Sequence, residues 1–148
     1  MAIDTTAVGR RLAPVDATVT AERLRFFAQV TGETRPEYLD ADAARVAGHR
    51  DILAPPTFAF TLQLIATDIP LAYLTELGVD LSRLLHGEQS FTYSGEICAG
   101  DEIRLDSVIT DIAEKKGGAL VFITDETTAT NQHGETVATI RRTCVVRA

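Results

Sequence analysis

The sequence contains no tryptophan, one methionine, two cysteines and three histidines among its 148 residues. Cys98 and Cys144 are too few for a disulfide framework, and no spacing of cysteine, histidine and carboxylate is typical of a zinc site. No apolar run approaches the ~20 residues of a membrane helix, and residues 1–10 lack the apolar segment of a signal peptide. We therefore expect a cytoplasmic protein with reduced thiols, without a metal and without membrane association.

Positive charge is scarce as well. Lysine and arginine number 14 against 21 aspartates and glutamates, and the net charge of -7 argues against binding to nucleic acid. Acidic pairs such as Asp101-Glu102 and Asp125-Glu126 are spread along the chain, so we expect them on a solvated surface. Hydrophobic residues reach 45%, enough for a packed core, and the length predicts a single domain over residues 1–148.

Proline is missing after Pro70, although the chain has five prolines. Because proline cannot donate a ladder hydrogen bond, its absence suits a sheet, and this part is rich in threonine, valine and isoleucine. Alternating polar and apolar residues predict four long strands at residues 87–94, 101–113, 120–130 and 136–147. Their hairpin spacing predicts an antiparallel meander.

The first part of the chain favours helices. After an extended stretch at residues 15–19, Thr20 is a plausible N-cap for a helix that ends at Gly32. Its expected apolar stripe consists of Leu24, Phe26, Phe27 and Val30. A polar loop at residues 33–38 and short helices at 41–47 and 71–77 flank residues 57–66, which are apolar nearly all round and read as a buried helix. The sequence therefore predicts an α+β fold in which a long, curved antiparallel sheet wraps around a central apolar helix.

Few residues have the pattern of a reactive group. Glycine-rich phosphate loops, dinucleotide fingerprints and the Gly-x-Ser-x-Gly elbow are absent, so no cofactor is predicted. Neither cysteine has a neighbouring lysine or histidine in sequence to lower its pKa. His133 lies in an expected turn and His49 follows a helix end, which favours structural roles. His86 begins a strand before Gly87, where a structural role and a site role are both open.

Two longer motifs carry a resemblance to a known family. They are Ile-Leu-Ala-Pro-Pro-Thr-Phe at residues 52–58 and His-Gly-Glu-Gln-Ser-Phe at residues 86–91, with a similar turn at residues 114–118. From about residue 13 to residue 147 the chain resembles the MaoC-like hydratases and dehydratases of the hotdog fold, in their N-terminal-type branch. The resemblance implies (R)-specific hydration of enoyl thioesters, or the reverse dehydration. This is a lyase reaction of fatty acid metabolism on acyl-CoA or acyl-carrier-protein substrates.

The resemblance also locates a catalytic loop, and here the chain departs from the family. Active members have Gly-Asp-x-Asn-Pro-x-His, whose carboxylate and imidazole hold a water molecule and move its protons. Residues 32–38 instead read Gly-Glu-Thr-Arg-Pro-Glu-Tyr, so Glu33, Arg35 and Tyr38 replace the aspartate, asparagine and histidine. A phenol with an ordinary pKa near ~10 is a poor substitute for imidazole at neutral pH. If Arg35 pairs with Glu33, it makes that carboxylate a weaker base.

The start of the central helix departs in the same way. Active relatives have a glycine whose amide polarises the thioester oxygen, whereas Pro56 has no N–H to donate. The amide of Thr57 could serve instead if the loop is shifted. The resemblance places Pro56, Thr57, Phe58, Phe60 and Gly87 at the substrate, although Phe58 and Phe60 equally suit a plain core role.

Three functions remain open from the sequence. The first is a non-catalytic subunit that shapes the acyl tunnel for a catalytic hotdog partner. The second is a self-sufficient hydratase or dehydratase that uses Glu33, Tyr38 or His86 in altered roles. The third is a non-enzymatic acyl-thioester-binding protein, and a thioesterase on the same fold is a minor further possibility. Either a homodimer or a heterodimer is expected, because one curved sheet leaves an open strand edge.

Overall fold

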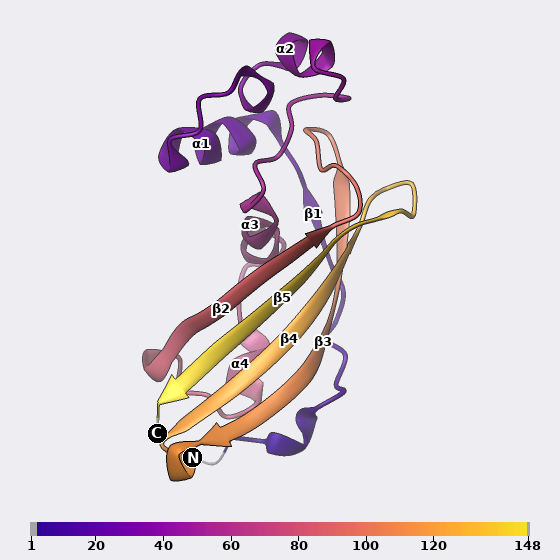
Figure 1. The fold of residues 1–148 in the computed structure, drawn as a ribbon. Helices are drawn as coiled ribbons and strands as arrows, with labels where there is room; N and C mark the ends of the chain where they lie inside the picture. The colour runs from indigo at the N-terminus through magenta and orange to yellow at the C-terminus, as the bar shows by residue number, and fades with distance from the viewer. Residues whose placement is uncertain (1–2, 148) are drawn as a thin grey trace.

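Five antiparallel strands form a single curved sheet in the computed structural model, which describes residues 3–147. The order across the sheet is β1-β3-β4-β5-β2 (Figure 1). The strands are β1 (Val15–Thr18), β2 (Leu84–Tyr93), β3 (Glu102–Lys115), β4 (Leu120–Thr130) and β5 (Thr136–Arg147). The short β1 and the ten-residue β2 form the two edges of the sheet.

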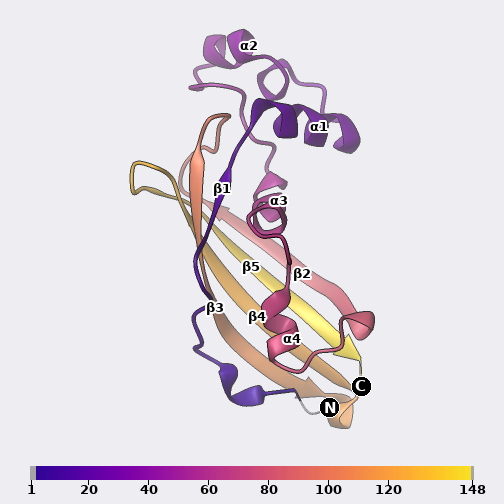
Figure 2. The same cartoon turned by 180° about the vertical axis from the view of Figure 1, so that it is seen from behind.

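Two helices lie in front of the concave face of the sheet (Figure 2). They are α3 (Phe58–Ile65) and α4 (Ala72–Glu76), and β3, β4 and β5 curve around them. The other two helices, α1 (Ala21–Thr31) and α2 (Ala41–Val46), project beyond one end of the sheet (Figure 1). The predicted α+β architecture, a curved sheet around a central helix, is confirmed and is the hotdog fold. No helix within residues 3–147 is both long and apolar enough to cross a membrane.

The predicted meander of four strands is correct only for β3, β4 and β5. The strand β2 pairs with β5 on the far side of the sheet, instead of with its neighbour in sequence, β3. The connection between β2 and β3 does not turn tightly because it pairs with the extended segment before α3. The amide of Ala54 donates to the carbonyl of Ile97 at 2.8 Å, and the amide of Ala99 donates to the carbonyl of Ile52 at 2.9 Å.

The helix α1 begins and ends as predicted. The Oγ1 of Thr20 accepts from the Arg23 amide, and Gly32 has the left-handed φ of 73°. The expected apolar stripe is wrong in part, since Phe26 and Val30 are 65% and 62% exposed. Phe26 follows the buried Leu24 by two positions, which at 3.6 residues a turn places it on the opposite face of the helix.

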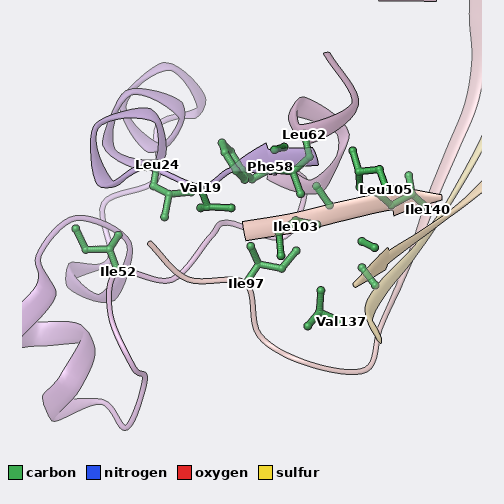
Figure 3. Packing of buried hydrophobic residues seen from close by; sticks show 14 residues of the cluster. Val19, Leu24, Ile52, Phe58, Leu62, Ile97, Ile103, Leu105, Val137 and Ile140 are labelled. Atoms are coloured by element: carbon green, nitrogen blue, oxygen red, sulfur yellow. The ribbon is translucent and has the colours of Figure 1, made fainter. Parts of the chain in front are cut away.

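Buried hydrophobic residues form two separate clusters. The first joins α1 and α3 to the sheet (Figure 3). In it, the rings of Phe27 and Phe58 meet edge to face, with 5.4 Å between their centroids. Its main members are Val19, Leu24, Ile52, Phe58, Leu62, Ile97, Ile103, Leu105, Val137 and Ile140. The second surrounds α4 and includes Leu74, Leu77, Val79, Ile109, Ile123, Cys144 and Val146. Polar side chains occupy the sheet between the two clusters.

Candidate functional site

The loop that follows α1 carries Glu33 and Tyr38, which the resemblance matches to the family's catalytic pair. It turns at Gly32 and then forms a short 3-10 helix, η2 (Pro36–Tyr38), where the sequence predicted only a polar loop. Proline stands at the first position of this helix, where its fixed φ is favourable and its missing N–H costs nothing. The loop therefore has a defined shape that fixes Glu33 at one end and Tyr38 at the other.

The carboxylate of Glu33 is fully engaged by its own neighbours. The backbone amides of Thr34 and Arg35 both donate to Oε1 at 3.0 Å. The Arg35 guanidinium adds hydrogen bonds to Oε1 at 3.2 Å and to Oε2 at 2.9 Å. Hydrogen bonds from the Arg35 side chain and then from its amide lower the pKa of Glu33 to about 2. The pairing that weakens Glu33 as a base is thus present, and at neutral pH the carboxylate is an acceptor only.

Tyr38, which the resemblance places at the position of the family's histidine, is 6% exposed. Its hydroxyl accepts a hydrogen bond from Nη2 of Arg35 at 3.1 Å, and the guanidinium carbon stands 4.6 Å from the ring centroid. Arg35 therefore holds Glu33 and Tyr38 together as one unit. Tyr38 also lines a pocket of about 150 Å³ at the start of α3, together with Pro56, Ala59, Tyr93 and Ile97.

Pro56, just before α3, and Tyr93 of β2 both line this pocket. Pro56 has no amide hydrogen, and its carbonyl accepts a hydrogen bond from the hydroxyl of Tyr93. Burial raises the pKa of Tyr93 to about 12, so this hydroxyl stays protonated. The next amide, that of Thr57, donates no hydrogen bond to any of residues 3–147, and Thr57 is exposed. One free amide therefore remains where the resemblance places the thioester oxygen.

The other predicted site residues lie apart from this pocket. His86 precedes Tyr93 by seven positions on β2, which corresponds to roughly 20 Å along a strand. The centroid of its ring lies 5.3 Å from the centroid of the Phe60 ring, and its Nε2 lies 3.2 Å from Oε1 of Gln89. Gly87 forms the bulge where β2 slips against β5. Phe58 is completely buried in the first hydrophobic cluster.

Both cysteines are buried and free. Burial is the main cause that raises the pKa of each thiol above its ordinary value. A raised pKa leaves less thiolate at neutral pH, and the thiolate is the nucleophilic form. Among residues 3–147, no three histidine, cysteine, aspartate or glutamate side chains gather in a way that could hold a metal ion.

The expectation that the acidic pairs lie on the surface is wrong for Asp101 and Asp125, which are both fully buried. Asp101 accepts two hydrogen bonds from the Arg50 guanidinium, at 2.8 and 2.9 Å, and others from Gln132 and the Cys98 amide. Burial alone would raise the pKa of Asp101, but these hydrogen bonds outweigh it and lower the pKa. Asp101 thus ties the segment before α3 to the start of β3.

Asp125 belongs to a polar belt that the sequence did not reveal. On the concave face it accepts from Arg142 at 3.0 and 3.2 Å and from the hydroxyl of Tyr73 at 2.7 Å. We define the polar belt as Ser107, Asp125, Thr127 and Arg142 of the sheet with Gln63 and Tyr73 of the helices. One signal pointed there: Arg142 precedes Cys144 by two positions on β5, so the two side chains share one face of the strand. Burial works against the charge of Arg142, but the attraction of Asp125 outweighs it and raises the pKa.

The sequence matches a known protein family and curated proteins of similar length. A family model described as the FAS1-like dehydratase domain region matches residues 6–140. The UPF0336 protein of Streptomyces griseus is 38% identical over 149 residues, which cover 100% of this chain and 97% of the relative.

Solved structures agree with the fold. A MaoC-like dehydratase superposes with a TM-score of 0.84 at 28% identity, covering 96% of this chain and 42% of that longer chain. The HadBC (3R-hydroxyacyl-ACP dehydratase) complex from Mycobacterium tuberculosis contains a chain that superposes with a TM-score of 0.81 at 23% identity, with 94% and 96% of the two chains covered.

Proposed function

This chain belongs to the MaoC-like family of hotdog dehydratases and hydratases, and on that premise we propose that it is the non-catalytic subunit of a two-hotdog enzyme. Its partner would be a hotdog chain with an intact Asp and His loop, and the substrate an enoyl or 3-hydroxyacyl thioester of coenzyme A or acyl carrier protein. In this proposal residues 1–148 form one cytoplasmic hotdog domain that shapes the acyl tunnel.

The state of Glu33 is the observation that carries the proposal. A general base must accept a proton near the working pH, and catalytic carboxylates are tuned upward toward neutrality. The four hydrogen bonds on Glu33 lower its pKa to about 2, in the opposite direction. Tyr38 is a poor replacement for the missing imidazole, because a phenol does not take up a proton at neutral pH, and its hydroxyl accepts a hydrogen bond from the same guanidinium. In this proposal the loop keeps its position in the fold but does not transfer protons.

The strand edge supports a partner. The strand β2 pairs with β5 on one side, and its other side ends the sheet. A ten-residue edge with exposed Leu85 and Tyr93 offers unpaired backbone groups to a second sheet. The HadBC dehydratase, whose chain superposes on this one, is itself a complex. We propose that the partner hotdog pairs along β2, with Phe60, His86 and Gly87 near the shared wall of the acyl tunnel.

An assay with crotonyl-CoA tests the proposal. The purified chain alone is expected to leave the enoyl absorbance unchanged, whereas the same chain mixed with a hotdog partner that carries an intact loop is expected to consume it. Size-exclusion chromatography of the mixture should show a complex of one chain with the other. In the complex, Glu33→Gln and Tyr38→Phe are expected to change the rate by less than about twofold, since neither group moves a proton.

The alternatives give different results in the same assay. Activity of the chain alone that is lost in Glu33→Gln would establish the self-sufficient enzyme and overturn the proposal. If the mixture stays inactive but hexanoyl-CoA raises the melting temperature of the chain alone, the non-enzymatic thioester-binding protein is the correct function, because a ligand of the native state stabilises it.

A further inference from the structure

A second pocket, of about 290 Å³, lies where the segment before β1 and the helices α3 and α4 meet the sheet. It shares no lining residue with the pocket around Tyr38. The apolar part of its wall includes Leu12, Val15, Ile69, Leu71 and Leu105. Four residues of the polar belt, Gln63, Tyr73, Ser107 and Arg142, also line it. The volume is at the lower end of the range for small-molecule sites.

One acceptor of the polar belt has no partner. The side-chain oxygen of Gln63 is buried and receives no hydrogen bond, although its amide nitrogen donates to Thr127 at 2.7 Å. Thr127 in turn shares a hydrogen bond of 2.7 Å with Ser107. Because buried polar atoms are nearly always paired, an unpaired oxygen at a pocket wall indicates a position for a donor.

One donor of the polar belt is also free. Arg142 is 5% exposed, and its Nε and Nη2 are occupied by Asp125 and Tyr73. Its Nη1 donates no hydrogen bond within residues 3–147. The charge of Arg142 is already balanced by Asp125, and Arg10 and Glu76 pair at the rim. The pocket thus offers at least one donor, Nη1 of Arg142, and one acceptor, Oε1 of Gln63, beside a buried ion pair that is complete. Arg11, the remaining charged residue of the lining, is exposed to solvent.

We propose that this pocket binds a small uncharged aliphatic molecule that carries hydroxyl groups. A hydroxyl can accept from Nη1 of Arg142 and can donate to the oxygen of Gln63, which matches the two unpaired groups. The aliphatic part would lie against the apolar walls. A carboxylate or an ammonium would bring an unbalanced charge into a pocket whose ion pair is complete, and burying such a charge is costly.

The test compares three probes of similar length on the unaltered chain: 1,2-hexanediol, hexanoate and hexylammonium. Titrations followed by ¹H–¹⁵N NMR should show that the diol shifts the amides of Ser107, Thr127 and Arg142 and the side-chain amide of Gln63. We expect the charged probes to bind at least about tenfold more weakly. In Gln63→Met the diol should bind about tenfold more weakly, as expected for one lost hydrogen bond. The matched control Gln29→Met, at an exposed position of α1, should leave binding unchanged.

Three results would overturn the proposal. If hexanoate binds as tightly as the diol, the arginine acts as an anion site and the charge argument is wrong. If no probe shifts these amides, the pocket holds only water. If the diol binds equally well to Gln63→Met, the unpaired oxygen plays no part. The comparison of probes needs no substitution, so it decides the matter even if Gln63→Met does not fold.

Discussion

Replacing Arg142 by methionine should destabilise the protein strongly, because it leaves the carboxylate of Asp125 buried with only the Tyr73 hydroxyl as a donor. Asp125 is 0% and Arg142 5% exposed, so water does not screen the pair. Breaking such a pair from one side costs about 3–5 kcal/mol. For a chain of this size, that loss lowers the melting temperature by about 10–15 °C. Thermal and urea denaturation followed by circular dichroism would measure both quantities.

Replacing Tyr73, Asp125 and Arg142 together should lower the free energy of unfolding far less. In the triple variant Tyr73→Phe, Asp125→Leu, Arg142→Met no buried charge is left unpaired, so we expect stability within about 2 kcal/mol of the parent protein. The matched control is Arg104→Met, which breaks an exposed pair with Asp106 at 3.2 Å and should cost no more than about 1 kcal/mol. The reasoning fails if Arg142→Met costs no more than Arg104→Met, or if the triple variant is as unstable as Arg142→Met.

Two further predictions concern the loop and the bulge. Because the pKa of Glu33 is lowered from 4.5 to about 2, the hydrogen-bonded carboxylate contributes stability that is complete above pH 4.5 and is lost as the pH falls toward 2. The difference in unfolding free energy between the parent protein and Glu33→Gln should therefore shrink between pH 4.5 and pH 2, and a difference that stays constant over that range would contradict the assignment. At the bulge, a Cβ on Gly87 would lie 2.8 Å from Cγ2 of Val145 and 2.9 Å from the carbonyl oxygen of Thr143. Gly87→Ala should thus cost about 1–3 kcal/mol in urea denaturation, and more than Gly95→Ala, whose nearest atom is a valine methyl at 3.2 Å; equal losses would count against a role for the close backbone approach.

Local pattern was sufficient to predict most of the elements of this fold. The bounds of β4 and β5 agree with the alternation read from the sequence, and the caps of α1 at Thr20 and Gly32 are where their chemistry predicts them. The pairing of β2 with β5 was missed because it depends on a contact between distant segments, which adjacent residues do not encode. Sequence spacing alone favoured the neighbouring strand.

In the candidate site, too, local interactions were predicted and those between distant residues were missed. The family motif proposed Glu33 and Tyr38 as site residues, which stays a prediction. The proximity of Arg35 in sequence suggested its pairing with Glu33, which the structure contains. The burial of Asp125 was missed because an acidic pair is usually solvated, and its partner Arg142 is seventeen positions away. A charged residue that alternates with apolar residues, on each of two neighbouring strands, would have indicated a buried ion pair. Asp125 follows Ile123 by two positions, and Arg142 precedes Cys144 by two.

The hydrogen bonds of Glu33 all come from the two residues that follow it. A loop that satisfies its own carboxylate in this way does not depend on a bound water or a substrate to keep its shape. In the non-catalytic subunit proposed above, residues 33–35 would therefore keep their shape without the catalytic pair of the active relatives.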